Sequence, residues 1–142
     1  AGLSQQQMDN AAVIVRVGRQ AGLPKQAQVI AIATALQESQ LLNLANPNWP
    51  VSMQMSNQGT GYDYDSVGLF QQRPTSGWGT PEQIMNPVYA ANKFYQALVD
   101  VPGWQQMPVT VAAQTVQGSA FPDAYAQHEA RAQQVVEAFG RP

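Results

Sequence analysis

The sequence contains no cysteine and a single histidine, His128, among its 142 residues. The absence of cysteine excludes disulfide bonds, thiol nucleophiles and thiolate metal sites. One histidine without cysteine also makes a zinc site improbable, so no metal is expected. The lack of disulfides does not argue against export, because exported proteins can fold without them.

Charged residues are also scarce. Only 11% of the residues are Asp, Glu, Lys or Arg, against about 25% in an ordinary domain. The net charge of −2 offers no basic face for nucleic acid, and no apolar run has the length needed to cross a membrane. Polarity comes instead from 21 glutamines, whose uncharged amides suit a neutral, hydroxyl-rich partner as well as solvent.

The length of the chain predicts one domain over residues 1–142. Its start at Ala1 fits either a processed protein or a domain cut from a longer secreted one. Ser4 and Gln7 form the pattern of a capping box, so a first helix is expected to run from there to Gly22. A second helix from Pro24 to Glu38 is apolar nearly all round, which predicts a central, buried helix.

Residues 43–67 lose the helical period. "VSMQMS" and "YDYDSV" alternate on either side of the turn-forming "NQGTG", which predicts a β-hairpin. Further helices are expected after Thr80 and Asn86, each a capping residue followed by proline, and over residues 109–118 and 122–139. The predicted fold is therefore mostly α, of the α+β type, with one small hairpin after the central helix.

Glu38 ends the most apolar helix of the chain. Its neighbours one turn away include Ala35, Leu41 and Leu42, which disfavour the charged form of a carboxyl group. A carboxyl group that keeps its proton is what a general acid needs. The alternative is a carboxylate at a helix end that faces water or is satisfied by a cap.

Two more carboxylates lie in the predicted hairpin. Asp63 and Asp65 are two residues apart and would share one face of a strand, with Tyr62 on the other face. A glycosidase often has a second carboxylate across the scissile bond from its general acid. The alternative is that both aspartates hydrogen-bond their own backbone at a turn.

The order of these parts resembles a known family. A helix ending in "ES" (Glu38-Ser39), a hairpin, "GLFQ" (Gly68 to Gln71) and the helix "NPVYAANKFY" are similar to the lysozyme-like superfamily, in its soluble lytic transglycosylase and goose-type lysozyme branch. The similarity covers roughly residues 24–125 and extends to a domain of secreted actinobacterial cell-wall proteins. It implies a lysozyme-like fold, Glu38 as the catalytic residue, no cofactor and a place outside the cytoplasm at the cell wall.

One family motif is altered. The family's "AYNAG" would fall at "AQTVQG", where Thr115 and Val116 replace the Tyr and Asn that hold sugar. Gln117 would then supply a substitute amide, and Tyr125 would supply a ring or pack the last helix. The complete set of expected substrate-binding residues is Ser39, Tyr62, Asp63, Asp65, Gln71, Gln72, Gln117 and Tyr125.

The resemblance implies cleavage of peptidoglycan between N-acetylmuramic acid and N-acetylglucosamine. A lytic transglycosylase would use Glu38 alone, as acid and then as base toward the muramyl 6-hydroxyl. A hydrolase would add Asp63 or Asp65 to position water or stabilise charge. The resemblance favours the transglycosylase, in which neither aspartate is expected to face Glu38.

Two alternatives belong to other classes. One is a non-catalytic peptidoglycan-binding module that kept the lysozyme-like shape, which the altered "AQTVQG" supports and the intact "QES" and "GLFQQ" oppose. The other is a helical interaction domain within a larger wall-remodelling or secretion assembly. The expected partners are glycan strands bound by a monomeric domain, with neither nucleic acid nor membrane insertion.

Overall fold

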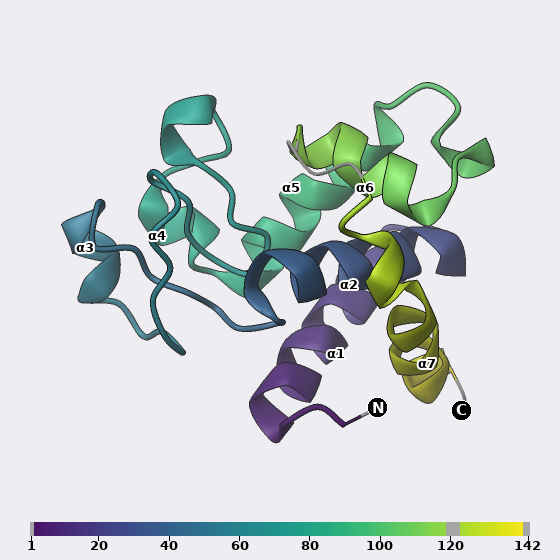
Figure 1. The fold of residues 1–142 in the computed structure, drawn as a ribbon, viewed down its shortest axis with the longest axis horizontal. Coiled ribbons are helices and arrows are strands. Elements are labelled where there is room, and N and C mark those ends of the chain that lie inside the picture. The colour runs from purple at the N-terminus through teal and green to yellow at the C-terminus, as the bar shows by residue number, and fades with distance from the viewer. Residues whose placement is uncertain (1, 119–122, 141–142) are drawn as a thin grey trace.

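The computed structural model describes residues 2–118 and 123–140, and it is mostly helical (Figure 1). The start of the last expected helix, before Asp123, lies outside these residues. The α-helices are α1 (Gln5–Gln20), α2 (Lys25–Ser39), α3 (Pro50–Met53), α4 (Pro81–Ile84), α5 (Pro87–Val99), α6 (Val109–Gln117) and α7 (Glu129–Gly140). The 3-10 helices are η1 (Pro74–Ser76), η2 (Trp104–Gln106) and η3 (Ala126–His128). None of the described helices is both long enough and apolar enough to span a bilayer.

Helix α2 is the central element of the fold. It packs against α1, α5, α6 and α7, and every residue from Ala27 to Leu36 is buried (Figure 1). This confirms the central, buried helix that its nearly continuous apolar sequence predicts. The helix ends because Gln40 and Leu41 adopt left-handed conformations, with φ of 56° and 60°. Glu38 therefore lies in the last turn of a helix that is held on several sides.

The helix starts predicted at Ser4, Thr80 and Asn86 are confirmed. The start of the helix expected over residues 122–139 is wrong within the described part, because α7 begins only at Glu129, after turns and the 3-10 helix η3. Ser4 caps α1 in a capping box with Gln7: the Gln7 amide donates to the Ser4 side chain, and the Gln7 side chain accepts from the Ser4 amide. Thr80 caps α4 in the same way, and the Asn86 side chain accepts from two amides of α5. These caps satisfy backbone N–H groups that a helix start leaves without partners.

A close contact joins α1 to α5 at Gly18. A Cβ atom at this position would lie 2.7 Å from the Tyr95 hydroxyl oxygen, so a larger residue does not fit. The Tyr95 hydroxyl donates a hydrogen bond to the Ile14 carbonyl at 2.8 Å. The glycine lets the two helices approach closely enough for this bond.

The expected β-hairpin is not formed. Residues 43–72 are described throughout, and they hold a short helix, Pro50–Met53, and isolated bridges rather than paired strands. Proline at the first helical position favours the helix. The buried Asn46 side chain replaces strand pairing, because its Nδ2 donates to the carbonyls of Tyr64 and Ser66, both at 3.0 Å. One amide thus satisfies backbone groups that a ladder would otherwise pair.

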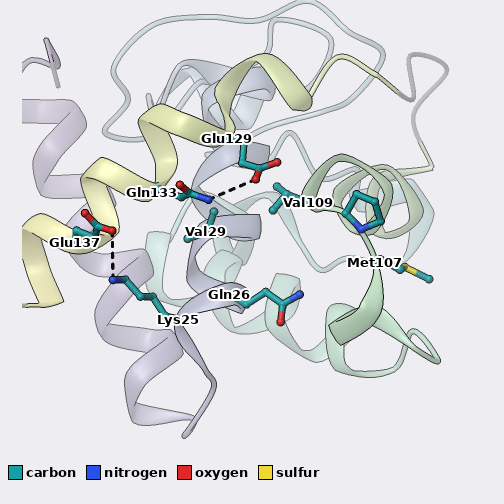
Figure 2. Close-up of a pocket in the computed structure, with 9 residues that line it drawn as sticks. Lys25, Gln26, Val29, Met107, Val109, Glu129, Gln133 and Glu137 are labelled. Carbon is teal, nitrogen blue, oxygen red and sulfur yellow. Dashed lines mark hydrogen bonds and ion pairs between the residues drawn. The ribbon is translucent and has the colours of Figure 1, made fainter.

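A groove lies at the start of α2, beside α7 (Figure 2). Its volume is about 510 Å³, and the Lys25 ammonium and the Glu137 carboxylate form an exposed ion pair across it at 3.7 Å. Lys25 and Glu38 are thirteen residues apart on one helix, which corresponds to about 20 Å. The groove is therefore separate from the surroundings of Glu38.

Candidate active site

Glu38 is half-buried and lines a hollow of about 710 Å³. The residues around it come from the end of α2, the loop over residues 63–78 and the end of α6. They are Gln37, Glu38, Asp63, Tyr64, Ser66, Gln71, Gln72, Arg73, Ser76, Trp78, Gln117 and Gly118. The structure thus brings together five of the expected site residues: Glu38, Asp63, Gln71, Gln72 and Gln117.

Two side chains hold the Glu38 carboxylate. The Tyr125 hydroxyl donates to Oε2 at 2.5 Å, and the Gln117 Nε2 donates to the same oxygen at 3.2 Å. Gln117 Nε2 also donates to the Phe70 carbonyl at 2.8 Å, which fixes the amide. Within the described residues no hydrogen bond ends on Oε1 of Glu38, so this oxygen remains for a ligand in the hollow.

Gln117 and Tyr125 therefore both contact the Glu38 side chain. Tyr125 has no exposed surface and does not line the hollow, so it contacts Glu38 from the interior and offers no open ring face to a ligand. Gln117 both lines the hollow and contacts the carboxylate. Of the substituted pair in "AQTVQG", Thr115 is exposed and bonds its own helix at the Val111 carbonyl.

Ser39 is placed in the interior. Its hydroxyl lies 3.1 Å from the Ala35 carbonyl and 2.6 Å from the Leu69 carbonyl, and the residue is buried. It does not line the hollow, so the expected contact with substrate is replaced by a tie between α2 and the segment after Gly68. Gly68 lies close to α4: at φ 85°, an added Cβ would stand 2.9 Å from the Ile84 carbonyl.

The two glutamines after Phe70 differ in exposure. Gln71 is half-buried in a left-handed conformation, and its Nε2 donates to the Gly68 carbonyl at 2.9 Å. Gln72 is 2% exposed, and its Nε2 donates to the Ala90 carbonyl at 3.2 Å. Gln71 is therefore the more accessible of the two to a ligand, while Gln72 joins the loop to α5.

Asp65 does not line the hollow beside Glu38. Its Oδ1 accepts from Arg73 Nε at 2.6 Å, and its Oδ2 accepts from the Thr75 amide at 3.0 Å and the Thr75 hydroxyl at 2.7 Å. Burial opposes ionisation of this carboxyl group, but these hydrogen bonds outweigh burial and lower its pKa to about 2. Asp65 is thus an ionised brace between the loop and η1.

The other two expected residues of this loop are exposed. Asp63 lines the hollow that holds Glu38, whereas Asp65 does not. That neither aspartate faces Glu38 stays a prediction. Tyr62 is 72% exposed and does not line the hollow; its hydroxyl accepts from Thr60 at 3.2 Å. Tyr62 therefore makes no contact that would place it in the site.

No protein-family model matches the chain, and a search of curated proteins finds no match. Among the described residues, no group of three or more His, Cys, Asp or Glu side chains is placed to hold a metal ion. The function is therefore argued from the arrangement around Glu38.

Residues missed by the sequence analysis also shape this site. Arg73 and Trp78 line the hollow but belong to no recognisable motif.

The side chain of Gln37 is fixed by residues near the start of α7. Its Oε1 accepts from Gln127 and lies 2.9 Å from His128 Nε2. Burial, and then the charge of Arg131, lowers the pKa of His128. A neutral imidazole that donates to Gln37 is consistent with both observations.

The brace at Asp65 predicts a specific dependence of stability on pH. Its pKa is lowered from 3.8 to about 2 on folding, so the stabilisation is fully present above about pH 4 and is lost as pH falls through 2. We expect the melting temperature of the wild type to fall more steeply between pH 4 and pH 2 than that of Asp65→Asn. Asp63→Asn is the control and should follow the wild type. Parallel curves for Asp65→Asn and the wild type would contradict the assignment.

Proposed function

We propose that the protein cleaves the glycan strands of peptidoglycan between N-acetylmuramic acid and N-acetylglucosamine, with Glu38 as general acid and then base. The observation that carries the proposal is the Glu38 carboxyl group itself. Tyr125 and Gln117 hold it by Oε2 at the edge of a hollow of about 710 Å³. A carboxyl group fixed at one oxygen, whose other oxygen has no hydrogen bond among the described residues, is placed to exchange a proton with a ligand.

The reaction would use one carboxyl group twice. Glu38 in its protonated form gives its proton to the glycosidic oxygen, the bond from C1 to that oxygen breaks, and the sugar gains oxocarbenium character. The Glu38 carboxylate then takes the proton of an attacking hydroxyl whose oxygen bonds to C1. If the muramyl 6-hydroxyl attacks, the product is a 1,6-anhydro ring; if water attacks, it is a reducing end.

The lining of the hollow supports a sugar ligand. Side-chain amides of Gln37 and Gln71 are there, and amides can both donate to and accept from hydroxyl and acetamido groups. Trp78 offers an aromatic ring, which can pack against the apolar face of a sugar. An amide-rich hollow with an aromatic ring beside Glu38 suits the binding of a sugar next to a proton donor.

Digestion of purified sacculi tests this function. Soluble products separated by mass should include fragments cut on the glycan strand. Anhydro ends identify a transglycosylase, and reducing ends identify a hydrolase. If the protein sediments with sacculi but releases nothing, the non-catalytic binding module is the better interpretation.

Asp63 is the residue that separates the two cleavage reactions. A transglycosylase needs no second carboxylate, so we expect Asp63→Asn to cost far less than the roughly 100-fold that losing a catalytic carboxylate costs at least. The measurement is the release rate of soluble fragments, with Asp100→Asn, at the exposed end of α5, as control. A loss of about 100-fold at unchanged melting temperature would instead assign Asp63 to a hydrolytic mechanism.

A further inference from the structure

Arg73 brings a positive charge to the hollow beside Glu38. The sequence has only seven Lys and Arg residues, and Arg73 is the one that lines this hollow among the described residues. Its side chain is 41% exposed. A neutral glycan does not require a cation here, so its presence calls for an explanation.

In the part of the chain that the structure describes, the guanidinium group is fixed along one edge. Asp65 binds Nε through Oδ1 at 2.6 Å, while its second oxygen is taken by Thr75. The Arg73 Cζ atom lies 4.7 Å from the centre of the Tyr64 ring, which supports one face of the plane. Among residues 2–118 and 123–140, no hydrogen bond is formed by either Nη nitrogen. An oriented guanidinium group with open Nη donors matches the geometry of a carboxylate.

We propose that Arg73 binds a carboxylate of the glycan ligand and thereby selects muramyl residues. The proposal rests on the proposed function, in which the substrate contains N-acetylmuramic acid. This sugar differs from N-acetylglucosamine by a lactyl group, which ends in a free carboxylate on strands without peptide. On strands with peptide, the lactyl carboxyl is an amide and the carboxylates belong to the peptide.

The other charged residues of the hollow would restrict where a ligand carboxylate can bind, and the contact with Arg73 would therefore fix the position of the glycan strand. Glu38 and Asp63 also line it, and both repel an anion when ionised. Asp65 already compensates part of the Arg73 charge, through the Nε bond. A ligand carboxylate is therefore favoured only within reach of the open Nη donors. Binding it there would set which glycosidic bond of an alternating strand lies at Glu38.

Binding to uncleaved oligosaccharides tests the proposal. In the Glu38→Gln background, dissociation constants are measured by calorimetry for an alternating tetrasaccharide with free lactyl carboxylates, its methyl ester and its peptide-bearing form. We expect the free acid or the peptide-bearing form to bind about tenfold or more tightly than the ester. Adding Arg73→Gln should remove this preference, and Arg73→Lys should restore part of it. Arg16→Gln, an exposed arginine of α1, is the matched control and should keep the preference.

Each outcome decides the matter. An Arg73-dependent preference for the free acid identifies the lactyl carboxylate, and one for the peptide-bearing form identifies the peptide. A preference that survives Arg73→Gln, or equal weakening of acid and ester, assigns Arg73 a structural role and overturns the proposal. Absence of binding to any of the sugars also overturns it. Digestion of sacculi by the wild type separately shows whether the proposed cleavage itself is correct.

Discussion

Glu38→Gln is expected to lower the release of soluble fragments from sacculi by about 100-fold or more, because general acid catalysis contributes about 10²–10⁴-fold. Glutamine keeps the size of the side chain and an oxygen that can accept from Tyr125, but it has no proton to give to the glycosidic oxygen. The melting temperature should therefore change little. The two measurements are the initial release rate and the thermal unfolding curve.

Glu137→Gln provides the matched control for this substitution. Glu137 is about half exposed and pairs with an exposed lysine at the far end of α2, so its loss should leave both rate and stability near the wild type (Figure 2). Wild-type turnover by Glu38→Gln would show that another group supplies the proton. A large fall in its melting temperature would mean that Glu38 has a structural role.

Phe94→Ala is expected to cause a large loss of stability. Phe94 has no exposed surface, and its ring stacks on Phe70 with centroids 4.8 Å apart. Truncation of a buried phenylalanine to alanine costs about 3–5 kcal/mol. At roughly 2–4 °C per kcal/mol for a chain of this size, the melting temperature should fall by about 10 °C. Urea unfolding gives the free energy directly.

The control for this loss lies on the same helix. Val88 of α5 is 48% exposed, so Val88→Ala should change the free energy of unfolding by well under 1 kcal/mol. If Phe94→Ala destabilised the protein no more than Val88→Ala, the stacked pair would not be part of the core. Phe70 also matters to the site, because its carbonyl holds Gln117 beside Glu38.

Local features of this protein were predictable from the sequence. The capping box of Ser4, the cap at Asn86 followed by proline, and the burial of α2 depend on residues within one or two helical turns. Such signals are read from spacing alone, because capping and helix periodicity involve neighbours in the chain. Glu38 was identified in the same way, as an acid that ends an apolar helix.

The alternation of polar and apolar residues over 51–67 predicted a β-hairpin wrongly, because strand pairing depends on partners that the pattern does not specify. Here the Asn46 side chain binds the carbonyls of Tyr64 and Ser66. Pro50 starts a helix instead of a strand. The same contacts put Asp63 in the hollow and leave Asp65 bound to Arg73. Equal spacing on a strand had predicted one face for both aspartates.

The local sequence identified the acid, but only the tertiary structure decided which groups surround it. Gln117 and Tyr125 bind Glu38 across 79 and 87 residues of chain, and Arg73 reaches the same hollow from the loop before η1. These partners come together because α2 is packed between α6 and α7, which brings the end of α6 and the start of η3 to Glu38 (Figure 1). Contacts at such separations depend on how helices pack, and no pattern of neighbouring residues specifies them.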